Sequence, residues 1–431
     1  MSLFLSSCGP TAKGQASEPK QTAPDRPGGP DLVPGHYLVV VEPRSGSNNP
    51  QMLGVAKARA LARSARMMAF ARSKNAEIRY EFENGLIGFS AAMKPEVAAE
   101  INAFPRVRVV QNQWVRAADT QRYPPDGLDR IDKRERLRDR MYSYRLNGEG
   151  VHVYVIDSGI FVSEEFDDES GKTRVAPDVQ DYVGAGSPDC SGHGTHVAGT
   201  IGGKTFGVAK KVTLHSVRVL DCNNRAQTDT VIAAVQWVIE NAKAPAILNM
   251  SLFTSHYPDL DKRVMDAIRA KLTVVVAAGN LTADFTKPDA CKVSPGGEGV
   301  PDAITVGNAN PLDDLVASTS FIGPCVDLFA PGVSIVSSRT MYGAGGEPRS
   351  GTSMSAAHVS GVAALYLEAA RGFPDWDTSP TGVWRAIDRA SIPFGNASIW
   401  PWRGGFVSGS PKKLLHWGPG GYDGLADHPI P

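Results

Sequence analysis

The segment GTSMSAAHVSG, residues 351–361, decides how this chain is interpreted. A Gly-Thr turn precedes Ser353, and a run of helix-forming, mostly apolar residues follows it. A serine in this position lies at a helix N-terminus, where unpaired backbone N–H groups and the positive end of the helix dipole face its hydroxyl. A nucleophile that must also stabilise an oxyanion needs this environment. Because serines often cap helices without any catalytic role, the interpretation depends on whether the chain also supplies a base and an acid.

Two further segments supply those groups. The segment VHVYVI, residues 151–156, predicts a buried parallel strand that ends at Asp157. Functional groups of open α/β sheets lie at the carboxyl ends of strands, so Asp157 is a candidate acid, with a role in a turn as the alternative. In SGHGTHVAGT, residues 191–200, two glycines flank His193 and leave its imidazole uncovered. His196, one turn further along the predicted helix, is interpreted as structural.

The order Asp157, His193, Ser353 and the motifs around these residues resemble those of the subtilisin-like serine proteases. The similarity is greatest to the proteinase K branch and its disulfide-bearing bacterial relatives. It implies an α/β fold, with a doubly wound and mostly parallel sheet covered by helices on both faces. The matching motifs are GLDRID at 127–132, YVIDSGI at 154–160, VVVAAGN at 274–280, DLFAPG at 327–332 and SGSPKKLL at 408–415.

The resemblance implies a role for each group in a serine-type endopeptidase. Ser353 would attack the scissile carbonyl, His193 would accept and return the proton, and Asp157 would orient the imidazole. The side-chain amide of Asn280 and the backbone N–H of Ser353 would bind the oxyanion. A turn residue after Ala-Ala-Gly is the alternative interpretation of Asn280. The predicted reaction is hydrolysis of peptide bonds through an acyl-enzyme.

The resemblance also places the substrate as an added strand between two edge segments. Phe253 and Thr254 stand where glycines usually follow Ser-Leu, and residues 223–227 replace a Gly-Ser-Gly-like run. These side chains could narrow the cleft, or the loops could shift and leave it open. Arg225 adds a cation that could favour acidic substrates. The expected substrate-binding residues are Asn224, Arg225, Ala226, Ser251, Leu252, Phe253, Ala277, Ala278 and Gly279.

Ala357 is a further departure, because the family commonly has proline four residues after the nucleophile. Proline would kink the helix, whereas alanine would let it straighten and shift Ser353, unless the exchange is neutral. A shift would change how the acyl-enzyme partitions between water and an amine. A transpeptidase or ligase is therefore one alternative function. A catalytically silent binding protein, suggested by the altered cleft edges, is another.

Composition limits the classes of function. A chain of 431 residues exceeds one typical core, so two or more units are expected. Its 45 basic and 45 acidic residues give no reason to expect a nucleic acid or an anionic membrane surface as a partner. We see no uninterrupted apolar stretch of the roughly 20 residues that a spanning helix needs. We expect a monomer whose partners are protein or peptide substrates.

A small domain is predicted over residues 35–118, before a peptidase domain at 119–417. Its β-α-β-β-α-β order is that of the ferredoxin-like split motif, with a hairpin signal at Asn84-Gly85. It resembles the subtilase propeptide, which assists folding and inhibits the enzyme, although it could be an unrelated domain. Cleavage is expected within residues 115–123. The predicted elements are strands at 36–41 and 107–112, two strands within 77–92, and helices at 53–74 and 95–104.

Residues 1–34 combine the start of a truncated signal with a Pro-, Gly- and Ser-rich linker that has almost nothing to bury. Leu5-Ser6-Ser7-Cys8 resembles a bacterial lipobox, in which the cysteine is lipidated; a stray cysteine near a misassigned start is the alternative. The enzyme is therefore expected to be secreted, or anchored at the cell surface through Cys8. Residues 418–431 are interpreted as a loose tail.

Four cysteines remain besides Cys8, which allows two disulfides in three possible pairings. A metal site is disfavoured because no Cys-x-x-Cys spacing is present. The resemblance to disulfide-bearing relatives favours the pairs Cys190–Cys222 and Cys291–Cys325.

The resemblance further implies a structural Ca²⁺ site. The matching ligands are the backbone carbonyls of Pro301 and Ala303 and the carboxylate of Asp327. Oxygen ligands suit Ca²⁺. Because Asp327 contributes a single carboxylate, an ordinary loop acid is the alternative.

Overall fold

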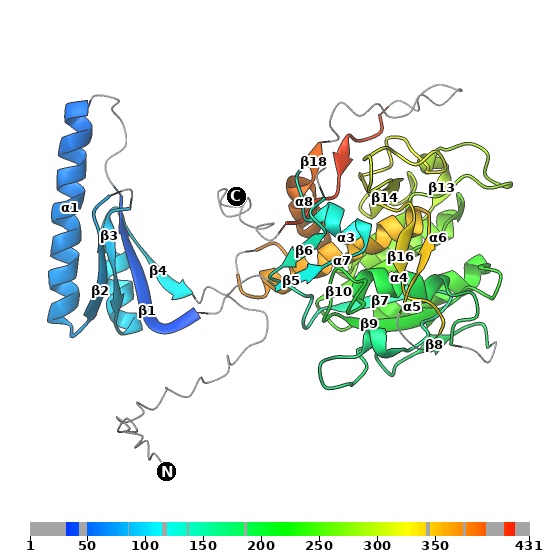
Figure 1. Ribbon diagram of the computed structural model, residues 1–431, viewed down its shortest axis with the longest axis horizontal. Coiled ribbons are helices and arrows are strands. Elements are labelled where there is room, and N and C mark those ends of the chain that lie inside the picture. Colours follow the sequence, from blue (N-terminus) through cyan, green and yellow to red (C-terminus); the bar gives the residue numbers. More distant parts are fainter. Residues whose placement is uncertain are drawn as a thin grey trace, which may run out of the picture.

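Two main sheets organise the chain (Figure 1). The computed structural model describes residues 32–42, 50–84, 86–113, 119–135, 138–184, 188–341, 345–373, 376–393 and 409–418. The predicted lipobox at Cys8, most of the linker and nearly all of the C-terminal tail lie outside these residues. Residues 114–118 of the predicted cleavage region also lie outside them.

The first sheet has four antiparallel strands in the order β2-β3-β1-β4, which is the ferredoxin-like arrangement predicted for this part of the chain. Helices α1 and α2 contact the sheet and each other, and Val39, Phe89 and Ile101 are fully buried in this core. A side chain at Gly88 would lie 1.9 Å from the Val39 carbonyl oxygen, so β3 can approach β1 only with glycine there. The elements are β1 (Leu32–Val41), α1 (Pro50–Ser73), β2 (Glu77–Phe82), β3 (Gly88–Ala92), α2 (Pro95–Asn102) and β4 (Val107–Gln113).

The second sheet has nine strands in the order β18-β19-β15-β14-β12-β10-β7-β9-β8. All neighbours are parallel except β18 and β19. The order of its strands confirms the predicted doubly wound sheet, because after β7 the chain forms β8 and β9 on one side of it and then β10, β12, β14, β15 and β19 on the other. The strands are β7 (His152–Asp157), β8 (Gln180–Asp181), β9 (Thr213–Arg218), β10 (Ala246–Met250), β12 (Thr273–Ala277), β14 (Ile304–Ala309), β15 (Leu328–Pro331), β18 (Ile392–Pro393) and β19 (Lys413–Leu414).

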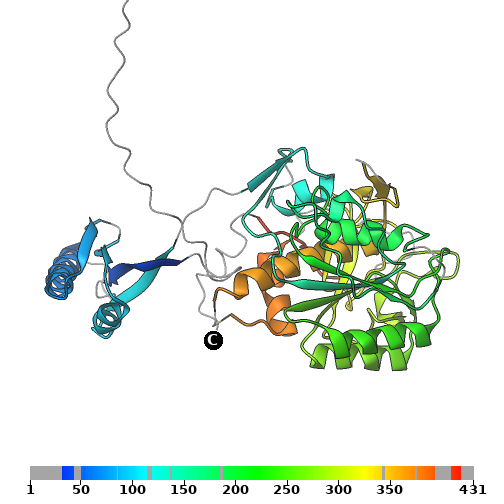
Figure 2. The ribbon, with the colours of Figure 1, turned by 90° about the horizontal axis from the view of Figure 1, so that it is seen from below.

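Helices cover both faces of this sheet (Figure 2). Along β7, Val153 and Val155 enter the core shared with α4, α7 and α8, whereas Tyr154 and Ile156 enter the core shared with α5 and α6. The central strands are buried on both faces, and this explains their nearly continuous apolar sequences. The helices are α3 (Asp126–Ile131), α4 (His193–Gly202), α5 (Thr228–Asn241), α6 (Pro258–Arg269), α7 (Thr352–Ala370) and α8 (Pro380–Ala390), with short turns η1 (Glu164–Phe166) and η2 (Ala290–Lys292).

Three two-stranded pairs complete the described structure. The pair β5 and β6 joins the start of this large domain to residues beyond α3. The pair β16 and β17 lies directly before α7. The strands are β5 (Asp119–Arg122) with β6 (Met141–Tyr144), β11 (Thr254–Ser255) with β13 (Val293–Ser294), and β16 (Ile335–Ser337) with β17 (Glu347–Arg349).

Helix α7 is buried along its whole length. It contacts β10, β12, β14 and β15, as well as α4 and α8. Its buried polar groups are paired: the Ser355 hydroxyl donates to the Ala330 carbonyl at 2.9 Å, and the Ser360 hydroxyl donates to Asn249 at 2.9 Å. The helix continues without a break through the fully buried Ala357. The core therefore fixes the position of the residues at its N-terminus.

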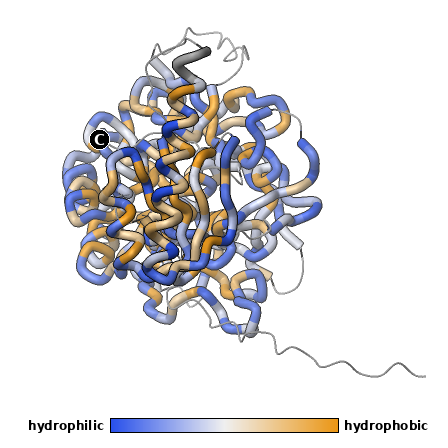
Figure 3. The backbone as a smooth tube through the Cα atoms, turned by 90° about the vertical axis from the view of Figure 1, so that its left-hand side faces the viewer, coloured by the Kyte–Doolittle hydropathy of each residue, from blue (hydrophilic) through white to orange (hydrophobic). Residues whose placement is uncertain are grey.

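Hydrophobic and hydrophilic residues alternate along the chain in the view of Figure 3. This alternation is expected where each element buries one face and exposes the other. Among the described residues, no helix has both the length and the apolar character needed to cross a membrane.

Candidate active site

The four predicted catalytic residues all follow or begin elements at one edge of the nine-stranded sheet. Asp157 is the last residue of β7, and Asn280 comes three residues after the end of β12. His193 is the first residue of α4, and Ser353 is the second residue of α7. The carboxyl edge of a parallel sheet is where α/β folds assemble functional groups.

The histidine and the aspartate form a close pair. The Nδ1 atom of His193 lies 2.7 Å from Oδ1 of Asp157, whose side chain is completely buried. Burial by itself opposes protonation of the imidazole, but the charge of Asp157 and its hydrogen bond outweigh burial and raise the pKa of His193. The imidazolium form of His193 is therefore stabilised, as a residue that accepts a proton as a general base requires.

The hydroxyl of Ser353 is held by the end of the neighbouring strand. Its Oγ donates to the carbonyl of Ser251 at 3.1 Å, and the Ser251 hydroxyl donates in return to the Ser353 carbonyl at 3.0 Å. A rotation about the Cα–Cβ bond of Ser353 would redirect this hydroxyl toward another acceptor. The contacts hold the backbone of Ser353 against the end of β10 while its side chain can still turn.

The Asn280 side chain is oriented by the turn before Ser353. Its Oδ1 accepts the backbone N–H of Thr352 at 3.0 Å, so its amide group is left to donate elsewhere. The Thr352 hydroxyl accepts the N–H of Gly279 at 3.2 Å, which ties the same turn to the end of β12. A side chain at Gly351 would lie 3.6 Å from this amide, and Gly351 has a φ of +153°. Glycine keeps the space beside the amide open.

A buried carboxylate that the sequence analysis missed shapes the turn before His193. Asp189 is 3% exposed and accepts hydrogen bonds from the N–H groups of Ser191, Gly192 and Thr195, and from two hydroxyls. One of these hydroxyls belongs to Ser158, which also accepts the N–H of Gly194 at 2.8 Å. The network thus joins the residue after Asp157 to the residues on both sides of His193. The sequence could have indicated this role, because the aspartate lies four residues before His193 in a turn that contains serine and glycine.

Comparison with known proteins agrees with this geometry. A model of the Subtilase family matches residues 148–389. The chain belongs to the subtilase family. Over 358 residues it is 41% identical to the extracellular serine proteinase of Thermus sp. (strain Rt41A), a match that covers 79% of this chain and 82% of the relative. It is also 41% identical over 296 residues to the alkaline serine exoprotease A of Vibrio alginolyticus, covering 67% of this chain and 53% of the relative.

A solved structure supports the same assignment. A cold-adapted subtilisin-like serine proteinase superposes with a TM-score of 0.59 at 40% identity, covering 68% of this chain and 98% of that chain. The predicted family, the subtilisin-like fold and the activity of a serine-type endopeptidase are thereby confirmed.

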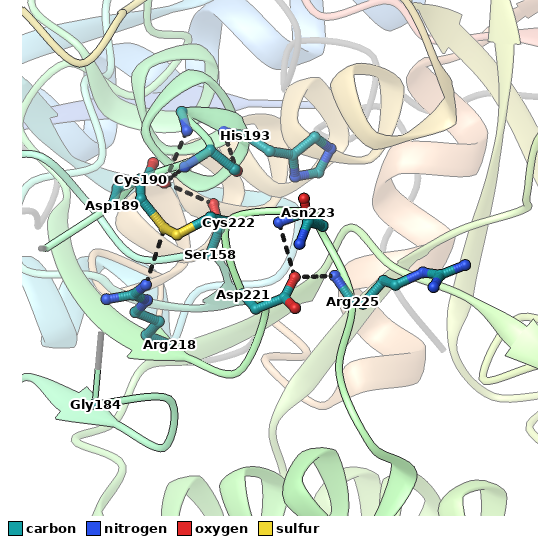
Figure 4. The surroundings of a disulfide bond; sticks show 12 residues. Ser158, Gly184, Asp189, Cys190, His193, Arg218, Asp221, Cys222, Asn223 and Arg225 are labelled. Carbon is teal, nitrogen blue, oxygen red and sulfur yellow. Dashed lines mark hydrogen bonds between the residues drawn. A yellow bond between two sulfur atoms is a disulfide. The ribbon is translucent and has the colours of Figure 1, made fainter. Parts of the chain in front are cut away.

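Both predicted disulfides are present in this subtilase. Cys190 and Cys222 are bonded with an S–S distance of 2.05 Å, and Cys291 and Cys325 with one of 2.09 Å. Figure 4 shows that the first bond connects the turn before His193 to the loop that carries Asp221, Asn223 and Arg225.

The loop beyond Cys222, where three of the predicted substrate-binding residues lie, forms a closed turn. Asp221 Oδ1 accepts the N–H groups of Asn223 and Arg225 at 2.8 and 2.9 Å, and Asn224 has a φ of +58°. The predicted substrate-binding residues Asn224, Arg225 and Ala226 are all exposed there. This loop is thus linked covalently to the turn of the predicted base.

The predicted substrate-binding residues after β10 include Phe253, which lies in an aromatic cluster. The half-buried Phe253 lies with its ring centroid 5.0 Å from Phe285 and 5.7 Å from Phe321. Phe321 in turn fills the space beside Gly279, where an added side-chain carbon would lie 2.6 Å from its ring. Ser251, Ala277 and Ala278 are buried, and Leu252 is half-buried. These predicted residues therefore meet around the end of β12.

His196 has a structural role, as the sequence suggested. Its Nε2 lies 2.9 Å from the Ile335 carbonyl and 3.1 Å from the Glu347 carbonyl. Burial lowers the pKa of His196 to about 4, so the imidazole is neutral and joins α4 to β16 and β17.

The predicted calcium ligand Asp327 lies beside the start of β14. Its Oδ2 accepts the N–H of Thr305 at 2.7 Å, two residues after Ala303, while Pro301 is exposed. Burial raises the pKa of Asp327 to about 7, which a bound cation would reverse. Carboxylate and carbonyl oxygens are the kinds of donor that Ca²⁺ takes. One other group of possible ligands among the described residues, Cys291, Glu298 and Cys325, is unsuitable because its sulfurs form a disulfide.

Proposed function

We propose that Asp157, His193 and Ser353 are the catalytic triad of this serine protease. The observation that carries the proposal is the 2.7 Å contact between His193 and the buried Asp157, at the same sheet edge as the N-terminus of α7. Subtilase membership supports it.

In the proposed reaction, the Ser353 hydroxyl turns from the Ser251 carbonyl toward His193. Its oxygen attacks the scissile carbonyl as Nε2 of His193 takes its proton, and Asp157 stabilises the imidazolium. The amide of Asn280 and the backbone N–H of Ser353 donate to the oxyanion. His193 then protonates the leaving amine, and water hydrolyses the acyl-enzyme by the reverse path.

The test is covalent labelling with an active-site-directed fluorophosphonate, together with casein cleavage. The wild type is expected to react, and Ser353→Ala is expected to lose both labelling and cleavage. Ser355→Ala, two residues further along the same helix, is the matched control, because its hydroxyl donates to Ala330 rather than to the site. Intact casein with the wild type would favour a silent binding protein instead.

We also propose that the enzyme is made as a zymogen, with residues 35–118 as propeptide and 119–417 as the peptidase. Support comes from the separate core of the small domain and from β5, which pairs with β6 and so ties the chain from Asp119 onward to the large domain. Wild type should shorten after expression, whereas Ser353→Ala should stay full-length. N-terminal sequencing of the mature chain would locate the bond within 115–123, and a wild type that stays uncut would contradict the proposal.

We propose that Pro301, Ala303 and Asp327 hold a structural Ca²⁺ ion through two backbone carbonyls and a carboxylate. The buried Asp327 carboxylate, with its raised pKa, supports this site. Calcium should raise the melting temperature of Ser353→Ala, and Asp327→Asn should remove most of that increase. An equal calcium effect in both proteins would place the ion elsewhere.

We propose that the enzyme acts outside the cell, either secreted or anchored through Cys8. The names of two relatives, an extracellular and a cuticle-degrading protease, and the two disulfides support an oxidising location. Labelling with a fatty-acid probe in a bacterial host, with Cys8→Ser as control, would distinguish anchoring from secretion.

A further inference from the structure

The proposed chemistry predicts where the part of the substrate that follows the scissile bond lies. The oxyanion must face Asn280, and the leaving amine must reach His193, which protonates it. The substrate segment after the scissile bond therefore passes His193 on the side away from Asn280. We place Arg349, on β17 and four residues before Ser353, beside this substrate segment, because it bonds to the turn before His193 and its charge acts on the imidazole.

Arg349 is fixed beside the histidine turn by two hydrogen bonds. Its Nη2 donates to the Ser191 carbonyl at 2.9 Å, and its Nε donates to Glu347 at 2.7 Å. A side-chain carbon added to Gly192 would lie 2.9 Å from Nη2, so the guanidinium packs directly against the residue before His193. β17 itself is held by β16 and by the imidazole of His196.

The Arg349 guanidinium lies close enough to His193 to affect its protonation, and it is exposed enough to contact a substrate side chain. The side chain is 27% exposed, and its Nη1 has no hydrogen-bond partner among the residues that the structure describes. Its positive charge opposes protonation of His193, whereas Asp157 and Asp189 favour it. Glu347, 38% exposed, compensates the charge only in part, because it contacts Arg349 through one nitrogen and is open to solvent screening.

We propose that Arg349 is a specificity-determining residue that binds an acidic side chain of the substrate on the leaving-amine side of the scissile bond. The guanidinium presents planar N–H donors that match a carboxylate. The inference rests on the proposed triad and adds a substrate class to the protease: proteins with aspartate or glutamate at the first or second position after the cut. It concerns a different cation from Arg225, which lies on the loop beyond Cys222.

The test uses mature enzyme and quenched peptides that differ only in one residue after the scissile bond: Asp, Asn or Lys. We expect the wild type to cleave the Asp peptide with a kcat/KM about 2- to 5-fold above the Asn peptide, as for a partly exposed ion pair. The ratio should fall toward one in 0.5 M salt. It should approach one in Arg349→Gln and survive in Arg349→Lys.

Two further variants make the result decisive. Arg263→Gln on α6 is the matched control, because Arg263 is also partly exposed (35%) and paired with an aspartate, but packs on the other face of the sheet. It should keep the wild-type ratio. Glu347→Gln should increase the ratio, because it releases the charge of Arg349, and this prediction stands even if Arg349→Gln does not fold.

The pH profile gives an independent readout. Removing the cation in Arg349→Gln should move the acid limb of kcat/KM to higher pH, and Arg263→Gln should leave it in place. Equal rates on Asp and Asn peptides in the wild type, or a preference that persists in Arg349→Gln, would overturn the inference. No cleavage of any of the three peptides by the wild type would instead count against the proposed triad itself.

Discussion

Two of the histidine–aspartate pairs in the described part of the large domain have nearly the same geometry, but the pKa of the histidine is shifted in opposite directions in them. His193 Nδ1 lies 2.7 Å from Asp157, and His215 Nδ1 lies 2.8 Å from Asp178. The first pair lies where β7 ends. The second lies beside His152, where β7 begins, about 16 Å away for five residues of a parallel strand.

The two pairs differ in which partner is buried. Asp157 is fully buried while His193 keeps 17% of its side chain exposed; Asp178 is 31% exposed while His215 is only 1% exposed. Burial lowers the pKa of His215, whereas the influence of Asp157 on His193 outweighs burial and raises its pKa. A buried carboxylate beside an accessible imidazole favours a histidine that can act as a base. An exposed carboxylate beside a buried imidazole favours a neutral histidine with a structural role.

The second nitrogen of each imidazole completes the contrast. His215 Nε2 is 2.8 Å from His152 Nδ1, and its ring stacks on Tyr154 at 4.0 Å, so both ring nitrogens are occupied. In the proposed mechanism, the second nitrogen of His193 must be available to Ser353. Distance to a carboxylate therefore does not identify a catalytic histidine; the surroundings of its other nitrogen do.

The largest expected effect separates the two aspartates directly. Asp157→Asn should reduce kcat by about 10⁴, because the wrong tautomer of His193 is then held. Asp178→Asn should leave kcat within about twofold and act on stability alone. Steady-state kinetics on one peptide and thermal unfolding of both variants would check this. A comparable loss of kcat in Asp178→Asn would mean that the two ends of the sheet are coupled.

A second prediction concerns Asn280, the amide donor proposed for the end of the sheet where His193 and Asp157 lie. Asn280→Ala should lower kcat by about 10²–10³ with little change in KM, because the donor acts on the oxyanion rather than on the bound substrate. Rates and KM values for one peptide would show it. A rise in KM with unchanged kcat would assign Asn280 to substrate binding instead.

A third prediction compares the two disulfides. Removing either pair by Cys→Ser should cost about 3–4 kcal/mol of unfolding free energy in the loop-entropy account. The Cys190/Cys222 variant should in addition change KM and kcat, because this bond joins the turn of His193 to the loop that carries three predicted substrate-binding residues. The Cys291/Cys325 variant is the control for stability without catalysis. Kinetics well below the unfolding temperature would separate the two, and identical kinetics would refute the link.

The smallest effects are expected in how the unfolding free energy depends on pH. The pKa of His152 is lowered to about 4 by burial and by His215, so the unfolded chain binds more protons than the native one between about pH 6.5 and 4. Unfolding free energy should therefore fall as pH falls through that window. His152→Asn in a Ser353→Ala background should flatten the decline, which chemical denaturation at pH 7, 5.5 and 4 would measure.

The pair of His193 and Asp157, whose catalytic role is proposed, should respond to pH in the opposite sense. Because the pKa of His193 is raised, the acid limb of kcat/KM should lie above the usual histidine value of about 6.5. Activity would then decline before stability does. A limb below that value would indicate that burial, rather than Asp157, controls His193.

Much of this architecture could be predicted from local patterns. Periodic apolar runs identified β7 and β12, and the turn signals around Asn84 identified a hairpin whose strands β2 and β3 do pair. The resemblance supplied the disulfide pairs and the residues that are proposed to act. Small errors were confined to ends: α1 begins at Pro50 and β1 at Leu32, earlier than their apolar patterns suggested.

The sequence alone determined the elements, the family and the identity of the groups proposed to act, because these depend on short motifs read in chain order. The tertiary structure decided what those groups meet. Asp189 became a five-donor acceptor, Arg349 came to lie against the turn of His193, and Asp178 came to pair with His215 only through folding. Such contacts join segments up to about 160 residues apart, as in Arg349 and Ser191, and no local pattern encodes them, because strand order and packing bring the side chains together.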